Sequence, residues 1–437
     1  MTDLPDWVGQ PLASQRPLIA YIDFKSPYAY LAVEPTRALA RECGIAVDWR
    51  PLVLDIPSFL GSAKLDNSGR VSEQKRSPEQ WSSVKYAYFD CRRYANLRGL
   101  TVRGTIKIWD CELAAVGMLW AKQHSDEILD RYLDAVYDPF WRRELDIEDV
   151  QVVSQTLAAA GADTAGFAEF LSGEGRTQNA ALQQAAFKAG IFGVPTFVVN
   201  GQCYFGREHL PRIRWHLQGE SGSPPDIAYP VAPAMDSTSD RLEVFVDFAS
   251  PLSYLALAPT LTCIETTQCN AIWHPAMGSA PRRPLPAAAD DGRPAQHRRL
   301  RSEALATDIQ RYAPHPLSDL YPDVDSRHAS MGLLWVNQCA PASASAYVAH
   351  TLERYWRHGE PIDTLNAICE ILSMLGLNAE PYTDYARSAG ADALARSQDA
   401  LRLRGVRGTP TYFVGDEPFL GRHHLPLITT KLRQGDG

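Results

Sequence analysis

The chain has 437 residues, of which 45% are hydrophobic and 22% charged, and its formal net charge is −8. These values are ordinary for a globular protein of two or three domains, and the acidic balance argues against nucleic acid or an anionic membrane as the main partner. No stretch approaches the roughly 20 apolar residues that a membrane-spanning helix needs. Residues 1–17 lack the basic and apolar regions of a secretory signal, so we expect a cytoplasmic protein.

The eight cysteines are scattered along the chain and form neither a C-x-x-C pair nor a zinc-type pair of pairs. Scattered cysteines fit a reducing compartment, where most of them are small buried apolar groups. We therefore expect no metal site and no cysteine nucleophile, Cys91 and Cys111 included.

The first half of the chain begins with a β-α-β pattern. Residues 18–24 form a short apolar run rich in β-formers, and residues 46–53 form a second one. Between them, the Ser26-Pro27 step predicts a helix start, because serine is a preferred N-cap and proline fits the first helical turn.

Residues 75–190 are rich in Ala, Leu, Glu and Arg with helical periodicity, which predicts a helical insert. Two β-rich runs, 196–200 and 202–205, then flank the Asn200-Gly201 turn and predict a hairpin, followed by a helix at 208–217. Residues 219–240 are rich in Pro, Ser and Gly, which predicts a semi-rigid linker.

The second half repeats the first. The motif Asp-Phe-Lys-Ser-Pro-Tyr-Ala-Tyr-Leu-Ala at 23–32 recurs as Asp-Phe-Ala-Ser-Pro-Leu-Ser-Tyr-Leu-Ala at 247–256. The offset is 224 there (250 minus 26) and 215 from Gly117 onward (332 minus 117), so copy two is nine residues shorter (224 minus 215). A duplicated domain follows from this order. The predicted boundaries are domain one at 1–218, a linker at 219–240 and domain two at 241–437.

The order of elements in each copy resembles the thioredoxin fold with a DsbA-type helical insertion. We therefore expect an α/β protein of two thioredoxin-like domains, each with such an insertion. The motif at 23–32, Gly-Val-Pro-Thr-Phe at 193–197 and Phe-Gly-Arg-Glu-His-Leu at 205–210 together resemble the family of kappa-class glutathione transferases and 2-hydroxychromene-2-carboxylate isomerases. The resemblance covers both copies apart from the linker.

This resemblance implies glutathione as cofactor. The family's helix-capping serine hydrogen-bonds the sulfur of glutathione, and Ser26 and Ser250 match it as the candidate catalytic residues. A thiolate at a helix N-terminus lies near partial positive charge, so its pKa falls below the usual value of about 8.5. The nucleophile would then be the cofactor's sulfur rather than a group of the protein.

The resemblance also implies cis-prolines at Pro195 and Pro410. The preceding residues, Val194 and Thr409, would then pair their backbone with the cysteinyl unit of glutathione. Lys25 counts among the candidate binding residues, with a solvated loop position as the alternative.

The family's glutamyl-binding pair, a small polar residue followed by an acid, falls at Arg207 and Glu208 in copy one. In copy two it falls at Arg422 and His423. Arginine departs from the family pattern in both copies, and His423 lacks the carboxylate that Glu208 keeps for an ammonium group. Copy one is therefore the expected active copy, and copy two is partly degenerate.

Several of these residues also have a purely structural interpretation. Ser26 and Ser250 could be N-caps alone, and both prolines could serve only the fold. Arg92 and Arg93 lie either in an acidic-substrate pocket or on a wet helix face. Four recurring tryptophans indicate core packing: Trp120, Trp141, Trp335 and Trp356.

The resulting hypothesis is a glutathione-dependent isomerase or transferase that acts on a small apolar, aromatic or unsaturated acid, with the cofactor thiolate held by Ser26. The alternative is a non-catalytic thioredoxin-fold protein that binds glutathione or another ligand. A DsbA-like disulfide oxidoreductase is disfavoured, because serine stands at positions 26 and 250 where the first cysteine would lie. Family members are commonly dimers, so the tandem could form an internal pseudo-dimer, with further self-association as a variant.

Overall fold

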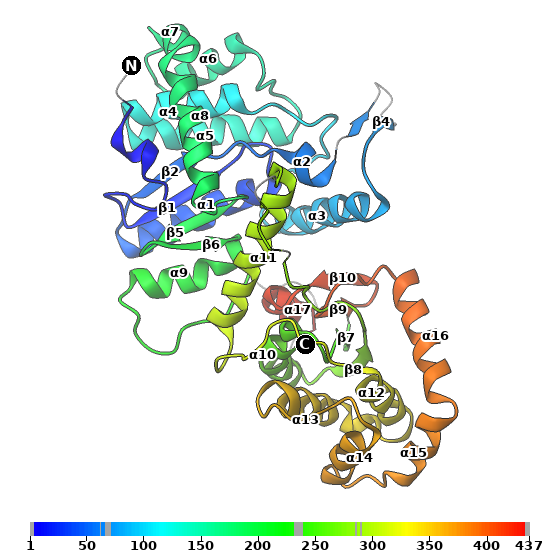
Figure 1. Ribbon diagram of the computed structural model, residues 1–437. Coiled ribbons are helices and arrows are strands. Elements are labelled where there is room, and N and C mark those ends of the chain that lie inside the picture. The colour runs from blue at the N-terminus through cyan, green and yellow to red at the C-terminus, as the bar shows by residue number, and fades with distance from the viewer. Residues whose placement is uncertain are drawn as a thin grey trace, which may run out of the picture. The chain divides into compact units, whose positions relative to one another are not determined.

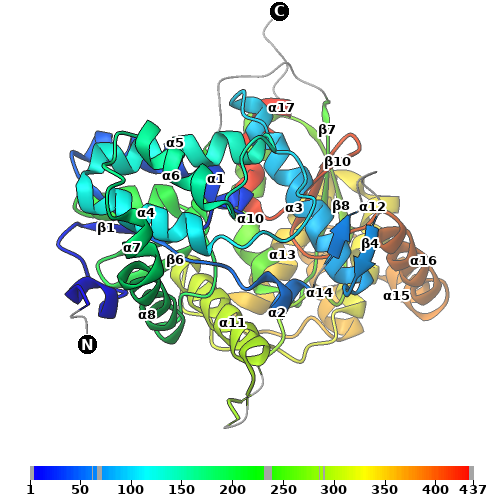
Figure 2. The same ribbon diagram turned by 90° about the horizontal axis from the view of Figure 1, so that it is seen from above.

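The computed structural model describes residues 4–61, 63–65, 71–230, 239–284, 286–288 and 291–432. The chain divides into two compact units. Unit 1 combines residues 1–232 with 286–301, and unit 2 combines residues 233–285 with 302–437. Segment 286–301 thus belongs to unit 1, a grouping that the repeat pattern does not suggest. Figures 1 and 2 show the elements of both units.

Unit 1 is built on a four-stranded mixed sheet with strand order β2-β1-β5-β6. The strands are β1 (Leu18–Ile22), β2 (Val47–Pro51), β5 (Thr196–Val199) and β6 (Gln202–Phe205). β1 runs parallel to β2 and antiparallel to β5, which forms a hairpin with β6. Every residue of β1, β2 and β5 is buried, as expected for strands covered on both faces.

Helix α1 (Pro27–Cys43) connects β1 to β2. A helical insert precedes β5 in the chain. The insert consists of α3 (Pro78–Leu97), α4 (Glu112–His124), α5 (Asp126–Trp141), α6 (Val150–Ala159), α7 (Phe167–Ser172) and α8 (Glu174–Lys188). α4 contacts α5 to α8, and these helices gather together in Figures 1 and 2. A short 3₁₀ turn and α9 (Leu210–Leu217) follow the hairpin.

The loop after β2 carries elements that the sequence pattern does not predict. They are a short helix, α2 (Ile56–Leu60), and a two-stranded ribbon of β3 (Ala63–Leu65) and β4 (Val71–Gln74). The ribbon lies in the stretch where copy two is shorter.

Unit 2 repeats this plan with strand order β10-β9-β7-β8. Its strands are β7 (Arg241–Val246), β8 (Asn270–Pro275), β9 (Thr411–Val414) and β10 (Glu417–Leu420). Its helices are α10 (Pro251–Thr267), α12 (Arg327–Cys339), α13 (Ala344–Trp356), α14 (Leu365–Met374), α15 (Glu380–Arg387), α16 (Gly390–Leu403) and α17 (Leu425–Leu432). Helix α11 (Arg293–Tyr312) begins in unit 1 and ends in unit 2. The predicted fold of two thioredoxin-like domains with helical inserts is confirmed.

The repeat extends to individual core contacts. The Tyr132 hydroxyl donates to the carbonyl of Ala114 at 3.0 Å, and its counterpart Tyr347 donates to Ala329 at 2.8 Å. A glycine lies under each hydroxyl, Gly117 in unit 1 and Gly332 in unit 2, where a Cβ would collide with the tyrosine.

The recurring tryptophans pack as the sequence predicts. Trp141 is buried in unit 1, and Trp335 and Trp356 are buried in unit 2. Trp120 is half-buried against Phe167 and Phe170. No helix in the described part of the chain is long and apolar enough to cross a membrane.

The tyrosine–glycine contact predicts the effect of a small substitution. Gly117→Ala should lower the free energy of unfolding by about 1–2 kcal/mol, because overlap with Tyr132 and Val153 outweighs the better helix propensity of alanine. Gly9→Ala, where a Cβ would meet no atom within 4 Å, should change it by less than about 0.5 kcal/mol.

Differential scanning calorimetry of the full chain measures both variants. Adding Tyr132→Phe should relieve part of the loss, because the atom that the new Cβ meets first is removed. A stabilised Gly117→Ala variant would contradict the packing described here.

Candidate functional site

The carboxylate of Asp23 organises the end of β1. One oxygen accepts the backbone N–H of Leu54 at 2.7 Å, from the loop after β2. The other accepts the N–H of Lys25 at 3.2 Å, while the Asp23 carbonyl accepts the N–H of Ser26 at 3.0 Å. One buried side chain therefore joins the loop after β2 to the turn that opens α1.

Ser26 caps α1 as predicted. Its Oγ accepts the backbone N–H of Ala29 at 3.2 Å, and Pro27 occupies the first helical position. Ser26 is 5% exposed, and its hydroxyl donates to no residue in the described part of the chain. A hydroxyl has one donor and two acceptor sites, so the cap leaves the proton free at the positive end of a 17-residue helix.

The Val194–Pro195 peptide is cis, as the resemblance implies. Because Thr196 pairs with Tyr21, Pro195 lies beside the end of β1 from which Ser26 follows. Across the described residues, the backbone of Val194 makes no hydrogen bond. Backbone N–H and C=O groups left unpaired in this way can bond to a peptide-like ligand.

The loop after β6 is tied to the same place, because the N–H of Gly206 donates to the Pro195 carbonyl at 2.9 Å. Gly206 has φ +117°, and a Cβ there would collide with the carboxylate of Glu208, which folds back against it. Glu208 is half-buried. The turn thus presents Glu208 next to the cis-proline.

Arg207 is more enclosed than its predicted role suggests. Its guanidinium lies 4.6 Å from the ring centre of Tyr94 and 4.0 Å from that of Tyr229, and the residue is 3% exposed. Its Nε and Nη2 atoms have no hydrogen-bond partner among the described residues. Only a ligand group that enters this cluster can reach them.

Tyr229 comes from the predicted linker, which packs on unit 1. The N–H of Ala228 donates to the carbonyl of Glu208 at 2.9 Å, and Arg212 Nε donates to the carbonyl of Pro225 at 2.9 Å. The composition of residues 219–240 predicted stiffness but gave no signal of this contact.

A buried acid lies beside Arg207. Asp90 is 1% exposed, and its carboxylate accepts Arg93 Nη1 at 2.9 Å, while the Tyr28 hydroxyl lies 3.5 Å away. Burial outweighs the two nearby guanidinium groups and raises the pKa of Asp90 to about 6. The interpretation of Arg93 as part of a wet helix face is wrong, because its pairing with Asp90 buries it; Arg92 is exposed.

Lys25 is also buried, at 7% exposure, with Nζ 3.6 Å from an Asp23 oxygen. The alternative of a solvated loop position is therefore wrong for Lys25. Cys111 lies nearby, and burial raises the pKa of its thiol well above the usual range, as it does for Cys91. Both remain neutral thiols.

Unit 2 keeps the hydrogen bonds that frame the site, but its serine is fully buried. Asp247 accepts the N–H groups of Ala249 at 3.0 Å and Ser279 at 2.9 Å, as Asp23 does in unit 1. Ser250 is 0% exposed, and its Oγ neither caps α10 nor meets any other hydrogen-bond partner within the described ranges. The Thr409 hydroxyl and the Ser279 hydroxyl share a hydrogen bond of 2.6 Å.

The remaining predicted residues of copy two are in equivalent places. The Thr409–Pro410 peptide is cis. Arg422 is buried, with its guanidinium 5.5 Å from the ring centre of Tyr312. The imidazole of His423 lies under Gly421, where unit 1 has the Glu208 carboxylate. An imidazole at this position replaces the carboxylate that would meet an ammonium group.

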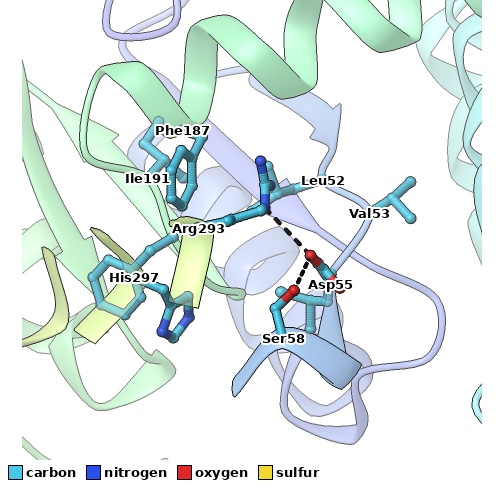
Figure 3. A pocket seen from close by; sticks show the side chains of 10 residues that line it. Leu52, Val53, Asp55, Ser58, Phe187, Ile191, Arg293 and His297 are labelled. Atoms are coloured by element: carbon cyan, nitrogen blue, oxygen red, sulfur yellow. Dashed lines mark hydrogen bonds and ion pairs between the residues drawn. The ribbon is translucent and has the colours of Figure 1, made fainter. Parts of the chain in front are cut away.

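A small pocket of about 20 Å³ adjoins the site in unit 1 (Figure 3). Ten residues line it: Leu52, Val53, Leu54, Asp55, Ser58, Phe187, Ile191, Phe192, Arg293 and His297. No sequence pattern points to the last two, which come from segment 286–301. Within the described residues, no group of three His, Cys, Asp or Glu side chains is placed to hold a metal ion.

The fold and the serine-capped helix define a thioredoxin-like protein without an active-site cysteine pair. The DSBA-like thioredoxin domain matches residues 18–218 and again residues 241–433. The chain therefore belongs to the DSBA-like thioredoxin family, with two copies of its domain.

Two curated relatives are named 2-hydroxychromene-2-carboxylate isomerase. The one from Sphingobium xenophagum is 28% identical over 202 residues, which are 45% of this chain and 95% of the relative. The one from Pseudomonas putida is 25% identical over 194 residues, 44% of this chain and 88% of the relative. A solved structure of a 2-hydroxychromene-2-carboxylate isomerase is 22% identical, covers 43% of this chain and 92% of its own, and has a TM-score of 0.34.

The raised pKa of Asp90 predicts a pH dependence of stability. Between pH 3.8, the ordinary pKa of an aspartate, and about pH 6, the folded protein keeps a proton on Asp90 that the unfolded chain releases. Asp90 therefore makes folding less favourable as pH rises. Relative to wild type, Asp90→Asn should gain on the order of 2–3 kcal/mol between pH 4 and pH 7.

Urea unfolding at a series of pH values measures this difference. The exposed Asp146→Asn serves as the matched control, and its curve should run parallel to that of wild type. A wild-type chain that gains stability over Asp90→Asn as pH rises would contradict the raised pKa of this buried carboxyl.

Proposed function

We propose that unit 1 binds glutathione and uses its thiolate in an isomerase or transferase reaction on a small apolar, aromatic or unsaturated acid. The observation that carries this proposal is the Ser26 hydroxyl, which caps α1 and keeps its proton free beside the cis-proline. The isomerase names of the two curated relatives support the reaction class.

The residues of unit 1 fit a glutathione molecule. The unpaired backbone of Val194 matches the peptide groups of the cysteinyl unit, and Glu208 offers a carboxylate to the glutamyl ammonium. Lys25 adds a buried positive charge next to Ser26. Arg207 Nε and Nη2, which have no hydrogen-bond partner among the described residues, can donate to a carboxylate of glutathione.

Bound there, glutathione supplies a thiolate that can add reversibly to a conjugated bond. The Ser26 hydroxyl would donate to the sulfur, and the N-terminus of α1 would favour its anionic form. Both contacts would lower the pKa of the bound thiol and leave the chain itself without a covalent role. Unit 2 does not fit as well, because Ser250 is fully buried and His423 replaces the acid.

Glutathione binding tests the cofactor site. The full chain should bind about one molecule, and Ser26→Ala and Glu208→Gln should each weaken binding about 10- to 100-fold, the effect of losing a hydrogen bond to a charged group. Ser26→Thr, which keeps both the cap and the hydroxyl, should retain binding. Ser250→Ala and His423→Gln are the matched controls in copy two.

Isothermal titration calorimetry measures affinity and stoichiometry, and ultraviolet titration of the bound thiolate measures its pKa. That pKa should rise in Ser26→Ala. Binding that survives Ser26→Ala but is lost in Ser250→Ala would move the site to unit 2. Absence of binding at millimolar glutathione would overturn the proposal.

The fate of glutathione separates the two reactions. With 2-hydroxychromene-2-carboxylate as the trial substrate, we expect glutathione-dependent conversion without loss of free thiol, the result for an isomerase. Stoichiometric thiol loss with a thioether product would instead indicate a transferase. Binding without turnover would favour the alternative, a non-catalytic glutathione-binding protein.

A further inference from the structure

The pocket of Figure 3 is lined by residues from two segments that also border the candidate site. Leu54 is the residue whose N–H donates to Asp23. Phe192 lies two residues before Val194 in the chain. The loop after β2 and the stretch before the cis-proline therefore serve both the candidate site and this pocket.

The walls of the pocket are mostly apolar. Leu52, Val53 and Leu54 come from the loop after β2, and Phe187, Ile191 and Phe192 come from the end of α8 and the residues that follow it. Apolar and aromatic walls with a few convergent polar groups are typical of sites for small organic ligands. An aromatic ring or a conjugated chain is the ligand body that such walls favour.

Arg293 closes the pocket from the first turn of α11. Its guanidinium lies 4.2 Å from the ring centre of Phe187, and a nitrogen lies 3.4 Å from a carboxylate oxygen of Asp55. Figure 3 shows the side chain extended between these two partners. The Asp55 carboxylate also accepts the Ser58 hydroxyl, so the aspartate is shared.

The pairing leaves Arg293 able to bind a second acid. Its ion pair is longer than the roughly 2.7–2.9 Å of a strong charge-assisted bond, and the Arg293 side chain is 49% exposed. The stacking on Phe187 holds the guanidinium plane while its donors stay accessible. A guanidinium so held can take a carboxylate through two parallel hydrogen bonds.

His297, one turn further along α11, adds no competing charge. It is buried, with its ring edge-on to Phe192 at 5.4 Å between ring centres. Burial, reinforced by the positive charge of Arg301, lowers the pKa of His297, which stays neutral at pH 7. Among the described residues that line the pocket, Arg293 is thus the one permanent cation.

We propose that Arg293 is a specificity-determining residue that binds the carboxylate of an aromatic or unsaturated acid, whose apolar body lies against Phe187, Ile191 and Phe192. This inference rests on the proposed function for the identity of the adjoining site. The pocket has room for about one water. A ring therefore enters only if the half-exposed Arg293 side chain moves from Asp55 toward the ligand carboxylate.

The test compares an acid with its neutral twin. Calorimetry on the full chain, with glutathione at saturation, gives the affinities of trans-cinnamate and trans-cinnamamide. Wild type should prefer cinnamate at least tenfold, and Arg293→Gln should lose that preference while its glutathione affinity stays within twofold. Arg293→Lys should keep part of the preference, because the charge remains without the planar fork. Arg298→Gln, on the same helix but outside the pocket lining, is the matched control.

Three outcomes would overturn the inference while the proposed function stands. The first is that Arg293→Gln keeps the wild-type preference for cinnamate, and the second is that wild type shows no such preference. The third is that Arg293→Gln loses glutathione affinity by as large a factor as cinnamate affinity, which would assign the guanidinium to a carboxylate of the cofactor. If wild type binds no glutathione, the proposed function fails, and the same comparison without glutathione still tests Arg293: a cinnamate preference lost in Arg293→Gln supports the pocket.

Discussion

The buried carboxylate at the end of the first strand of each copy is the contact on which the site depends. A carboxylate that leaves water must be compensated by donors, and Asp23 finds them in the backbone of Leu54 and Lys25 and in the Lys25 ammonium. These donors come from two separate loops. The compensation therefore also fixes the distance between the serine-capped helix and the wall of the pocket, so the charge that is costly to bury serves to position the site.

The two copies show which parts of this arrangement are framework. In unit 1 Gln183 accepts the N–H of Val53 and donates to the Pro51 carbonyl, and in unit 2 Gln398 does the same for Met277 and Pro275. Contacts of this kind satisfy backbone groups, so the fold needs them in both copies. The side chains that would face a ligand are under no such constraint. Lys25 is replaced by Ala249 and Glu208 by His423, and the copies share the same fold.

Local pattern was sufficient for the strands of the two four-stranded sheets, for the Ser26 cap and for the hairpins β5–β6 and β9–β10, because each depends on residues close together in sequence. It failed for Ser250, whose side chain makes no capping hydrogen bond, and for the ribbon β3–β4. The cis-prolines came from the family resemblance and not from pattern. What local pattern could not supply is burial that depends on distant partners. Arg93 has a charge that suggests solvent, but the acid one turn before it buries it. Tyr229 lies in a stretch with linker composition, and its contact with Arg207 is one of those that show the stretch packing on the first domain.

The position of segment 286–301 gives the duplication a physical meaning beyond repetition. Its residues Arg293 and His297 lie among those of the first copy, on a pocket whose other walls are all encoded before residue 193. A single copy would leave Phe187 and Phe192 without this cover, and Asp55 without its arginine. The second half of the chain can therefore matter for recognition even with its own serine buried.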